Sequence, residues 1–314
     1  MNPIVQVLHL KKHFPMKGGK MVYAVDGVSF DLRRGETLGL VGESGSGKST
    51  VARCVLQLLR PTEGDVLFEG QNLVGLSEAG LKRFRRQMQI IFQDPYGSLT
   101  PRMKVMSLLR EPLEVHGVGN AAQREEMVVN LLRKVGLKPE HLTRYPHEFS
   151  GGQRQRISIA RALILKPKVL VADEPVSALD VSIRAQILNL LVDLQKEFDL
   201  SYLFVSHDLS VIKYMCERIM VMYLGKIVEA APKDTLFSSY QHPYTMALIS
   251  AIPVPAVREK RHRLVLQGDV PSPSKPPSGC RFQTRCPYKS DLCDREEPLL
   301  KKIGEGHYVA CHLR

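Results

Sequence analysis

A phosphate-binding pattern lies near the start of the chain. Residues 42–50 read Gly-Glu-Ser-Gly-Ser-Gly-Lys-Ser-Thr, after an apolar run at 37–41 and before a helical pattern at 51–59. Strand, glycine-rich loop and helix form the setting that this pattern requires, because the backbone N–H groups of the loop then surround an anion at a helix N-terminus. Lys48 is placed to reach the β- and γ-phosphates, and Ser49 to bind Mg²⁺. The pattern predicts a nucleoside triphosphate site made by Gly42, Ser44, Gly45, Ser46, Gly47, Lys48, Ser49 and Thr50.

Two carboxylates follow a short apolar run in the second half of the chain. Asp173 and Glu174 come directly after it, and ligands of open α/β sheets bind at that end of the strands. Asp173 is expected to bind Mg²⁺, which prefers oxygen ligands. Glu174 is placed to polarise a water for attack on the γ-phosphate, and a positioned base contributes about 10²–10⁴-fold.

Two further polar residues follow predicted strands. His207 comes after the apolar run at 201–206, and Gln93 comes after the run at 89–92. We expect His207 to contact the γ-phosphate and to hold the attacking water in register. Gln93 is expected to bind Mg²⁺ or water and to transmit that state through the loop that it begins. Both residue types are also common in plain structural roles, so their position at the sheet edge carries the prediction.

A second anion site is predicted about a hundred residues after the first. Ser150, Gly151, Gly152 and Gln153 place a capping hydroxyl and two glycines at a helix N-terminus. A single molecule that binds one triphosphate does not need two such anion sites. Two molecules arranged head to tail would use both sites, because the second site of each would contact the γ-phosphate held by the other.

The elements that position these residues indicate an α/β fold. Apolar runs with strand character occur before and between the motifs, and a helical pattern at 181–198 follows Glu174. Residues 103–142 are helical in pattern and predict a helical insertion in the α/β domain. The predicted strands are 5–10, 22–32, 37–41, 65–68, 89–92, 168–173, 201–206, 219–223 and 226–229, the last two forming a hairpin.

The bulk composition is that of a globular protein with a basic surface. The chain has 314 residues and a net charge of +12, with small basic clusters at 82–86 and 258–263. That charge suits an anionic membrane surface, nucleic acid or a merely solvated face, and charge alone does not separate them. No apolar run is long enough to span a bilayer and no leader pattern opens the chain, so we expect a cytoplasmic protein.

In this order the motifs resemble those of ABC-transporter ATPases. The resemblance covers residues 1 to about 250. It rests on the phosphate loop, Gln93, the 150–153 signature, the 173–174 carboxylates and His207, which occur in the order typical of that family. The resemblance implies a P-loop ATPase domain with a parallel-sheet core, an antiparallel β edge and a helical subdomain, here at about 95–165. It implies ATP and Mg²⁺ as ligands, with Ser49, Gln93 and Asp173 around the metal. It also implies that Asp180 links the two sites of a dimer and that Phe14 stacks on adenine, with Tyr23 as a rival.

The C-terminal region resembles the extension of dipeptide and oligopeptide importer ATPases. The motifs are His-Pro-Tyr-Thr at 242–245, Gly-Asp-Val-Pro-Ser-Pro at 268–273 and Pro-Ser-Gly-Cys at 277–280. We therefore divide the chain into an ATPase domain at 1–252 and an extension at 253–314. The F-type dipeptide subunit is the most similar, although glutathione, nickel and antimicrobial-peptide importers share the extension.

Four of the six cysteines crowd the end of the chain: Cys280, Cys286, Cys293 and Cys311. In a cytosolic chain such a cluster favours a metal over disulfides. Structural zinc sites usually contain a tight cysteine pair, and this cluster has none, whereas an iron–sulfur cubane tolerates wider spacing. We predict a [4Fe–4S] cluster, a reading that the resemblance favours, with zinc or free thiols as alternatives and His307 and His312 as substitute ligands.

The resemblance implies an importer subunit at the cytoplasmic face of the membrane. Its expected partners are a second, homologous ATPase subunit, two transmembrane permeases and an extracytoplasmic substrate-binding protein, with no specific nucleic acid. In such an assembly the loop at 93–102, with Tyr96 and Leu99 expected to be exposed, would receive a short channel helix. The alternatives are an importer of another cargo, a soluble ABC ATPase acting on nucleic acid or ribosomes, and a cluster-bearing regulatory ATPase.

Overall fold

The computed structural model describes residues 3–252 and 266–314, which form two compact units. Unit 1 contains residues 3–32, 37–74 and the chain from 204 onward, and unit 2 contains residues 33–36 and 75–203. The predicted domain boundary at 252–253 coincides with the end of the first described range. The basic cluster at 258–263 lies outside the described residues. That division of the chain therefore stays a prediction.

Unit 1 contains a four-stranded antiparallel sheet. Its strand order is β2 (Met21–Leu32), β1 (Val5–Pro15), β4 (Glu63–Phe68) and β5 (Gln71–Asn72). The inward side chains Val5, Val7 and Val66 are buried, as expected where alternate residues of a strand face a core. The predicted strands are confirmed, with β1 extending five residues beyond its predicted end.

A second set of strands in unit 1 carries the phosphate loop. Strand β3 (Thr37–Val41), buried throughout, runs parallel to β9 (Arg218–Tyr223), and β10 (Lys226–Pro232) returns antiparallel to β9. The predicted hairpin is confirmed: Leu224 and Gly225 both have positive φ, as a two-residue turn between twisted strands requires.

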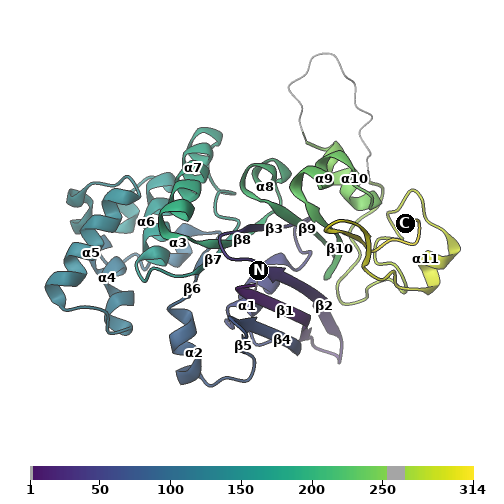
Figure 1. Ribbon diagram of the computed structural model, residues 1–314, viewed down its shortest axis with the longest axis horizontal. Helices are drawn as coiled ribbons and strands as arrows, with labels where there is room; N and C mark the ends of the chain where they lie inside the picture. Colours follow the sequence, from purple (N-terminus) through teal and green to yellow (C-terminus); the bar gives the residue numbers. More distant parts are fainter. Residues whose placement is uncertain (1–2, 253–265) are drawn as a thin grey trace, which may run out of the picture. The chain divides into compact units, whose positions relative to one another are not determined.

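The C-terminal region continues this sheet rather than forming a separate body. Strand β12 (His307–Val309) pairs with the free edge of β10, and β11 (Lys301–Gly304) pairs with β12. Figure 1 shows this yellow hairpin beside β10 and the small α11 beyond it. The sequence pattern predicts no strand here, and the pairing gives the extension backbone hydrogen bonds to the rest of unit 1.

The helices of unit 1 begin at recognisable caps. Asp208 accepts a hydrogen bond from the Ser210 amide at the start of α8, and His242 accepts one from the Tyr244 amide at the start of α10. Pro243 occupies the first position of α10, where its missing N–H costs nothing. The helices are α1 (Lys48–Val55), α8 (Leu209–Met215), α9 (Lys233–Ser238), α10 (Pro243–Ser250) and α11 (Asp291–Arg295).

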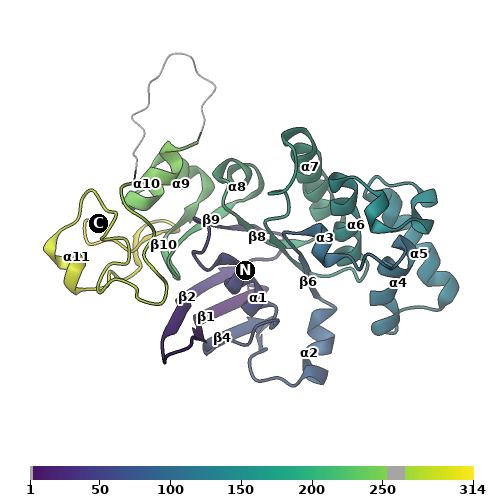
Figure 2. The ribbon, with the colours of Figure 1, turned by 180° about the vertical axis from the view of Figure 1, so that it is seen from behind.

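Unit 2 pairs two parallel strands with a group of helices. Strand β6 (Met88–Ile91) runs parallel to β7 (Val169–Asp173), and β8 (Ser201–Ser206) carries the chain from unit 2 into unit 1. Figure 2 shows α4, α5, α6 and α7 gathered together. The helices are α2 (Glu78–Arg85), α3 (Pro95–Ser98), α4 (Val105–Val115), α5 (Ala121–Lys134), α6 (Gly151–Leu163) and α7 (Val181–Phe198), with 3₁₀ turns at Pro139–Thr143 and Pro146–Glu148.

None of the helices in the described ranges has the length and apolar character of a bilayer-spanning segment.

Candidate nucleotide-binding and hydrolysis site

The phosphate loop connects β3 to α1 in unit 1, and close backbone approach requires two of its glycines. A Cβ atom on Gly42 would lie 2.1 Å from the Met222 carbonyl oxygen, and one on Gly47 would lie 2.1 Å from the Ala24 carbonyl oxygen. Gly47 also has φ of +105° at the N-cap of α1, a conformation that glycine adopts without steric cost. These contacts hold the loop against β2 and β9.

Lys48 is buried at the first position of α1, with 4% of its surface exposed. Its Nζ ammonium donates to the carbonyl oxygens of Gly42 at 2.7 Å and Glu43 at 2.8 Å, and to the Ser46 hydroxyl at 3.3 Å. The ammonium therefore lies within hydrogen-bond distance of the loop backbone that the pattern assigns to the phosphate site. A buried cation at a helix N-terminus is a strong anion attractor, since helix dipole and side chain act with the same sign.

The C-terminal region binds the same loop through Glu43. The guanidinium group of Arg285 donates to both Glu43 carboxylate oxygens, at 2.7 and 3.2 Å. The backbone N–H of Glu43 donates to the Tyr244 hydroxyl at 2.8 Å, and burial raises the pKa of that hydroxyl. No sequence signal predicts this contact, because Glu43 occupies a variable position of the loop pattern and its partners lie about two hundred residues away.

Around this contact the C-terminal region packs with a cluster of aromatic rings. Phe282, 1% exposed, contacts Tyr223, Tyr244 and His242 at ring-centroid distances of 5.2, 5.4 and 5.6 Å. Arg281, from the same segment, pairs with Asp26 and donates to the Leu224 carbonyl. Burial alone would raise the pKa of Asp26, but Lys226 and then Arg281 outweigh it and lower that pKa.

A buried carboxylate anchors the start of α10 and the last strand. Glu229 is fully buried and accepts three hydrogen bonds, from the backbone amides of Gln241 (2.8 Å) and His242 (2.9 Å) and from the His307 ring (2.8 Å). Burial lowers the pKa of His242 to about 3, so its ring is neutral and its Nδ1 atom accepts from the Tyr244 amide. The His-Pro-Tyr-Thr motif thus positions Tyr244 against the phosphate loop.

Unit 2 brings together Gln93 and Glu174. The Gln93 amide donates to a Glu174 carboxylate oxygen at 3.0 Å, at the carboxyl ends of β6 and β7. Glu174 has φ of +49°, a conformation that costs a non-glycine residue free energy and is frequent at functional sites. The Ser177 hydroxyl donates to the Glu174 carbonyl at 3.1 Å. Asp173, the last residue of β7, is buried.

The 150–153 signature begins α6 as a capping box. The Ser150 hydroxyl accepts from the Gln153 amide at 3.3 Å, and the Gln153 side chain accepts from the Ser150 amide at 3.1 Å. Gly152 packs on α7, where a Cβ atom would lie 2.5 Å from Ile183, whereas a Cβ atom on Gly151 would reach Leu179 only at 3.7 Å. Ser150 and Gly151 are exposed, as is Asp180 at the N-cap of α7.

The remaining predicted residues divide between the two units. Unit 1 holds Phe14, near the end of β1, and His207, an exposed residue directly after β8. The Lys12 ammonium lies 5.0 Å from the Phe14 ring centre, and Tyr23 makes an edge contact with His13 at 4.7 Å. These contacts do not favour either Phe14 or Tyr23 as the ring that stacks on adenine. Unit 1 therefore carries the phosphate loop and His207, and unit 2 carries the carboxylates, Gln93 and the signature.

The loop at 93–102 corrects one expectation. Tyr96 is exposed, as predicted, and its ring lies 4.9 Å from the Arg154 guanidinium. Leu99, predicted to be exposed, is only 1% exposed. The short helix α3 turns Leu99 inward, and the Arg161 guanidinium donates to the neighbouring Ser98 carbonyl at 3.2 Å. A docking role for this loop would therefore fall to Tyr96.

The four C-terminal cysteines lie in one neighbourhood as free thiols. Burial, with smaller contributions from the nearby Cys293, Cys311 and Cys286, raises the pKa of Cys280 to about 11. Within the described ranges, no three or more His, Cys, Asp or Glu side chains are arranged to hold a metal ion. The predicted [4Fe–4S] ligand set is thus unsupported. His307 and His312 are engaged elsewhere, with Glu229 and with the Glu296 carbonyl.

Known protein families match both parts of the chain. Residues 25–177 match the family described as ABC transporter, and residues 228–293 match the one described as Oligopeptide/dipeptide transporter, C-terminal region. The Oligopeptide transport ATP-binding protein AppF of Bacillus subtilis (strain 168) is 51% identical, across 99% of this chain and 97% of its own length. The Putative oligopeptide transport ATP-binding protein YkfD of the same organism is 53% identical, across 99% and 95%.

Solved structures resemble the chain over most of its length. The ATP-binding cassette MJ0796, solved as a dimer in a post-hydrolysis state bound to ADP and Pi, superposes with a TM-score of 0.67 and 30% identity, covering 73% of this chain and 98% of its own. The cbiO1 protein of Clostridium perfringens, part of the ABC transporter complex cbiONQ, gives a TM-score of 0.67 and 28% identity, covering 76% and 92%.

Proposed function

This chain belongs to the ABC-transporter family of ATP-binding subunits, and we propose that it hydrolyses ATP to power the uptake of dipeptides or oligopeptides. The family and the predicted P-loop α/β fold class rest on near full-length relatives and on the superposed cassettes. Membership makes the chain an ATPase. The peptide cargo rests on one observation above all, the match of residues 228–293 to the C-terminal region of peptide transporters.

The site residues divide the hydrolysis reaction among themselves. The phosphate loop and Lys48 bind the triphosphate, with Phe14 proposed to stack on adenine. Ser49, Gln93 and Asp173 would hold Mg²⁺ through the oxygen ligands that it prefers, and the ion would supply positive charge against the triphosphate. Glu174 accepts a proton from the attacking water, and Gln93 orients the carboxylate by the hydrogen bond that it already donates. His207 would hold the γ-phosphate.

Assembly into a head-to-tail dimer is supported by what unit 2 exposes. Ser150, Gly151 and Asp180 are accessible, and Val181 beside Asp180 has 80% of its surface exposed. An accessible capping serine and a large exposed apolar side chain suit a surface that closes on the nucleotide of a partner subunit. We propose that ATP binding drives this closure and that the partner is a second, homologous ATPase subunit.

The wider assembly follows from the proposed import role. We place the chain at the cytoplasmic face of the membrane, bound to two permease subunits that receive cargo from an extracytoplasmic binding protein. Because this binding protein and the permeases select the cargo, glutathione and nickel remain the alternatives within the importer class. A soluble ABC ATPase acting on nucleic acid or ribosomes is the alternative outside it.

We retain a metal centre at the four cysteines as a finer proposal, with [4Fe–4S] first and zinc second. Its support is the shared neighbourhood of the four thiols, which influence one another electrostatically. Protein purified without oxygen should be brown and contain roughly four irons per chain, and Cys286→Ser should remove the colour. Colourless protein carrying one zinc would favour the second reading.

Affinity purification from membranes in mild detergent tests the importer role. We expect the tagged chain to recover two multi-span permeases and a homologous ATPase, and recovered ATPase activity to rise when cargo-loaded binding protein is added. Peptides, glutathione and nickel, each supplied with the binding protein, separate the cargo alternatives. Recovery of ribosomes or nucleic acid without permeases would contradict the proposal.

A further inference from the structure

A basic pocket of about 850 Å³ lies within unit 2, at the amino-terminal ends of β6 and β7. Gln87 and Lys168, the residues just before these strands, both line it, and the Lys168 amide donates to the Gln87 carbonyl at 2.8 Å. Gln93, Asp173 and Glu174 lie at the opposite, carboxyl ends of the same strands. The pocket is thus separate from the hydrolysis residues of this unit.

The charge of the pocket has one sign. Five of its lining residues are cationic, namely Lys82, Arg83, Arg86, Lys166 and Lys168, and none is an aspartate or glutamate. Glu78 and Glu114, acidic residues near the pocket in sequence, are already paired with Arg85 and Arg110. In the described part of the chain, no carboxylate forms an ion pair with Lys82, Arg86 or Lys166. A recess lined by one sign of charge concentrates oppositely charged ligands.

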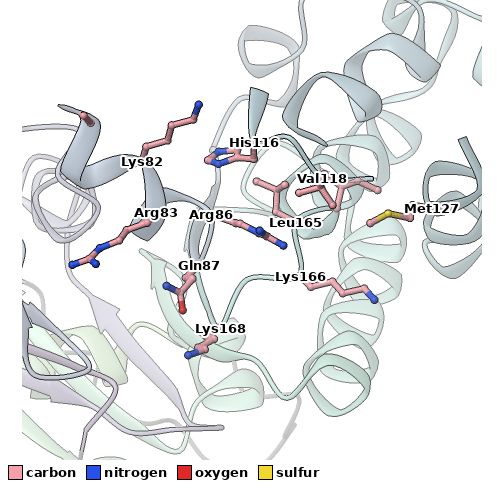
Figure 3. Close-up of a pocket in the computed structure, with 12 residues that line it drawn as sticks. Lys82, Arg83, Arg86, Gln87, His116, Val118, Met127, Leu165, Lys166 and Lys168 are labelled. Atoms are coloured by element: carbon pink, nitrogen blue, oxygen red, sulfur yellow. The ribbon is translucent and has the colours of Figure 1, made fainter. Parts of the chain in front are cut away.

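The lining side chains come from residues 79–87, 116–127 and 164–168. Figure 3 shows Arg86 extending toward Leu165, with His116 on one side and Lys166 on the other, whereas the guanidinium group of Arg83 points away. His116 is half-buried beside these cations, and burial, then Lys82 and Arg86, lower its pKa. Val118, Met127 and Leu165 form an apolar wall. The pocket therefore combines a cationic side with an apolar one.

We propose that this pocket binds an anion carrying two or more clustered phosphate groups. Guanidinium groups match phosphate oxygens two at a time and ammonium groups act as point charges, so Arg86, Lys82 and Lys166 together suit more than one phosphate. The volume lies in the upper part of the range of about 300–1,000 Å³ for ligand pockets, which leaves room for an uncharged portion against the apolar wall. A soluble polyphosphorylated metabolite and a lipid headgroup with two phosphates are the two kinds of ligand that have this chemistry.

Two probes applied to the full-length chain separate these sources. The phosphate loop is first saturated with Mg²⁺ and a non-hydrolysable ATP analogue, so that it does not compete. Inorganic tripolyphosphate is then titrated by calorimetry, and phosphatidylcholine vesicles with or without cardiolipin are sedimented with the protein. The test variant is Lys82→Gln/Arg86→Gln. The control is Arg133→Gln/Lys196→Gln, which removes two exposed cations of the same unit outside the pocket.

The pocket variant should bind one probe at least about tenfold more weakly than wild type, as expected when charge-assisted hydrogen bonds to phosphate are lost. The control should stay close to wild type. Loss confined to tripolyphosphate assigns a soluble ligand, and loss confined to cardiolipin vesicles assigns a lipid. Equal binding by pocket and control variants in both assays would overturn the site. Melting curves verify folding, and Lys166→Gln alone repeats the test if the double variant melts early.

Discussion

Glu174 is where backbone strain and hydrolysis chemistry coincide. Its left-handed backbone follows a buried strand and places its carboxylate against the Gln93 amide. Glu174→Gln preserves size and still offers Gln93 an oxygen acceptor, but it removes the base. We expect ATP hydrolysis, measured as phosphate release, to fall by about two to four orders of magnitude, with ATP binding retained. Wild-type turnover in the purified variant would remove Glu174 from this role.

His242 makes stability depend on pH in a definite direction. Burial holds its pKa at about 3, whereas an unfolded imidazole takes up a proton below about 6.5. Between these values the unfolded chain binds more protons, so the stability that this residue contributes at neutral pH is lost as the pH falls from 6.5 toward 3.

His242→Asn tests this linkage. Asparagine retains an acceptor for the Tyr244 amide at the helix cap but does not titrate. Compared with wild type, the variant should lose less unfolding free energy between pH 7 and pH 4, by on the order of a few kcal/mol, as measured by urea unfolding. His9→Asn, which removes an exposed imidazole from the same unit, is the control. Parallel losses in all three proteins would contradict the prediction.

Among the elements, the contact between the C-terminal region and the phosphate loop has the most direct functional consequence. Arg285 and the hydroxyl of Tyr244, which lies in α10, bind the side chain and the backbone of Glu43. Both connections limit how the loop between β3 and α1 can move. The extension therefore supports the nucleotide site without supplying a group to the chemistry.

Arg285→Ala should weaken ATP binding by about tenfold, because a charge-assisted hydrogen bond is worth about 1.5–3 kcal/mol and part of that restraint on the loop would be lost. Arg295→Ala, an exposed position in α11, is the matched control. Glu43→Gln combined with Arg285→Ala should cost less than the sum of the two single changes, since they remove the same contact. Additive effects on the dissociation constant of a fluorescent ATP analogue would argue against direct coupling.

At the scale of the whole molecule, the structure indicates which signature glycine can be changed to test assembly. A Cβ atom at Gly151 would lie 3.7 Å from its nearest neighbour, Leu179, whereas a Cβ atom at Gly152 would lie only 2.5 Å from Ile183. Gly151→Asp should therefore fold and still block the partner's γ-phosphate. Gly151→Asp and Lys48→Ala should each be inactive as homodimers.

Mixed in equal amounts, these two inactive chains should recover roughly a quarter of the wild-type composite sites, because each mixed head-to-tail dimer keeps one intact site of two. Phosphate release by the mixture measures this, with each variant alone as the control. Failure to recover activity in a verified mixed dimer would exclude head-to-tail sharing.

Features encoded by neighbouring residues were predicted from the sequence. The phosphate loop between strand and helix, the hairpin at 224–225 and helix α7 are all present. Each depends on hydrophobic periodicity, turn residues or glycine spacing within a few positions of the chain. The order of the phosphate loop, the 150–153 signature and the 173–174 carboxylates along the chain was enough to indicate the family.

Only the tertiary structure revealed the features that join distant residues. Arg285 and Glu43 are 242 positions apart, and neither has a local signal for pairing. Strand β11 is exposed along its whole length, so it lacks the alternation that predicts a strand and forms by pairing with β12. The burial of Leu99 and the gathering of cations in the basic pocket could not be predicted either, because both depend on which segments pack together. Spacing along the chain predicts a residue's chemistry, but its neighbours in space follow from the path of the whole chain.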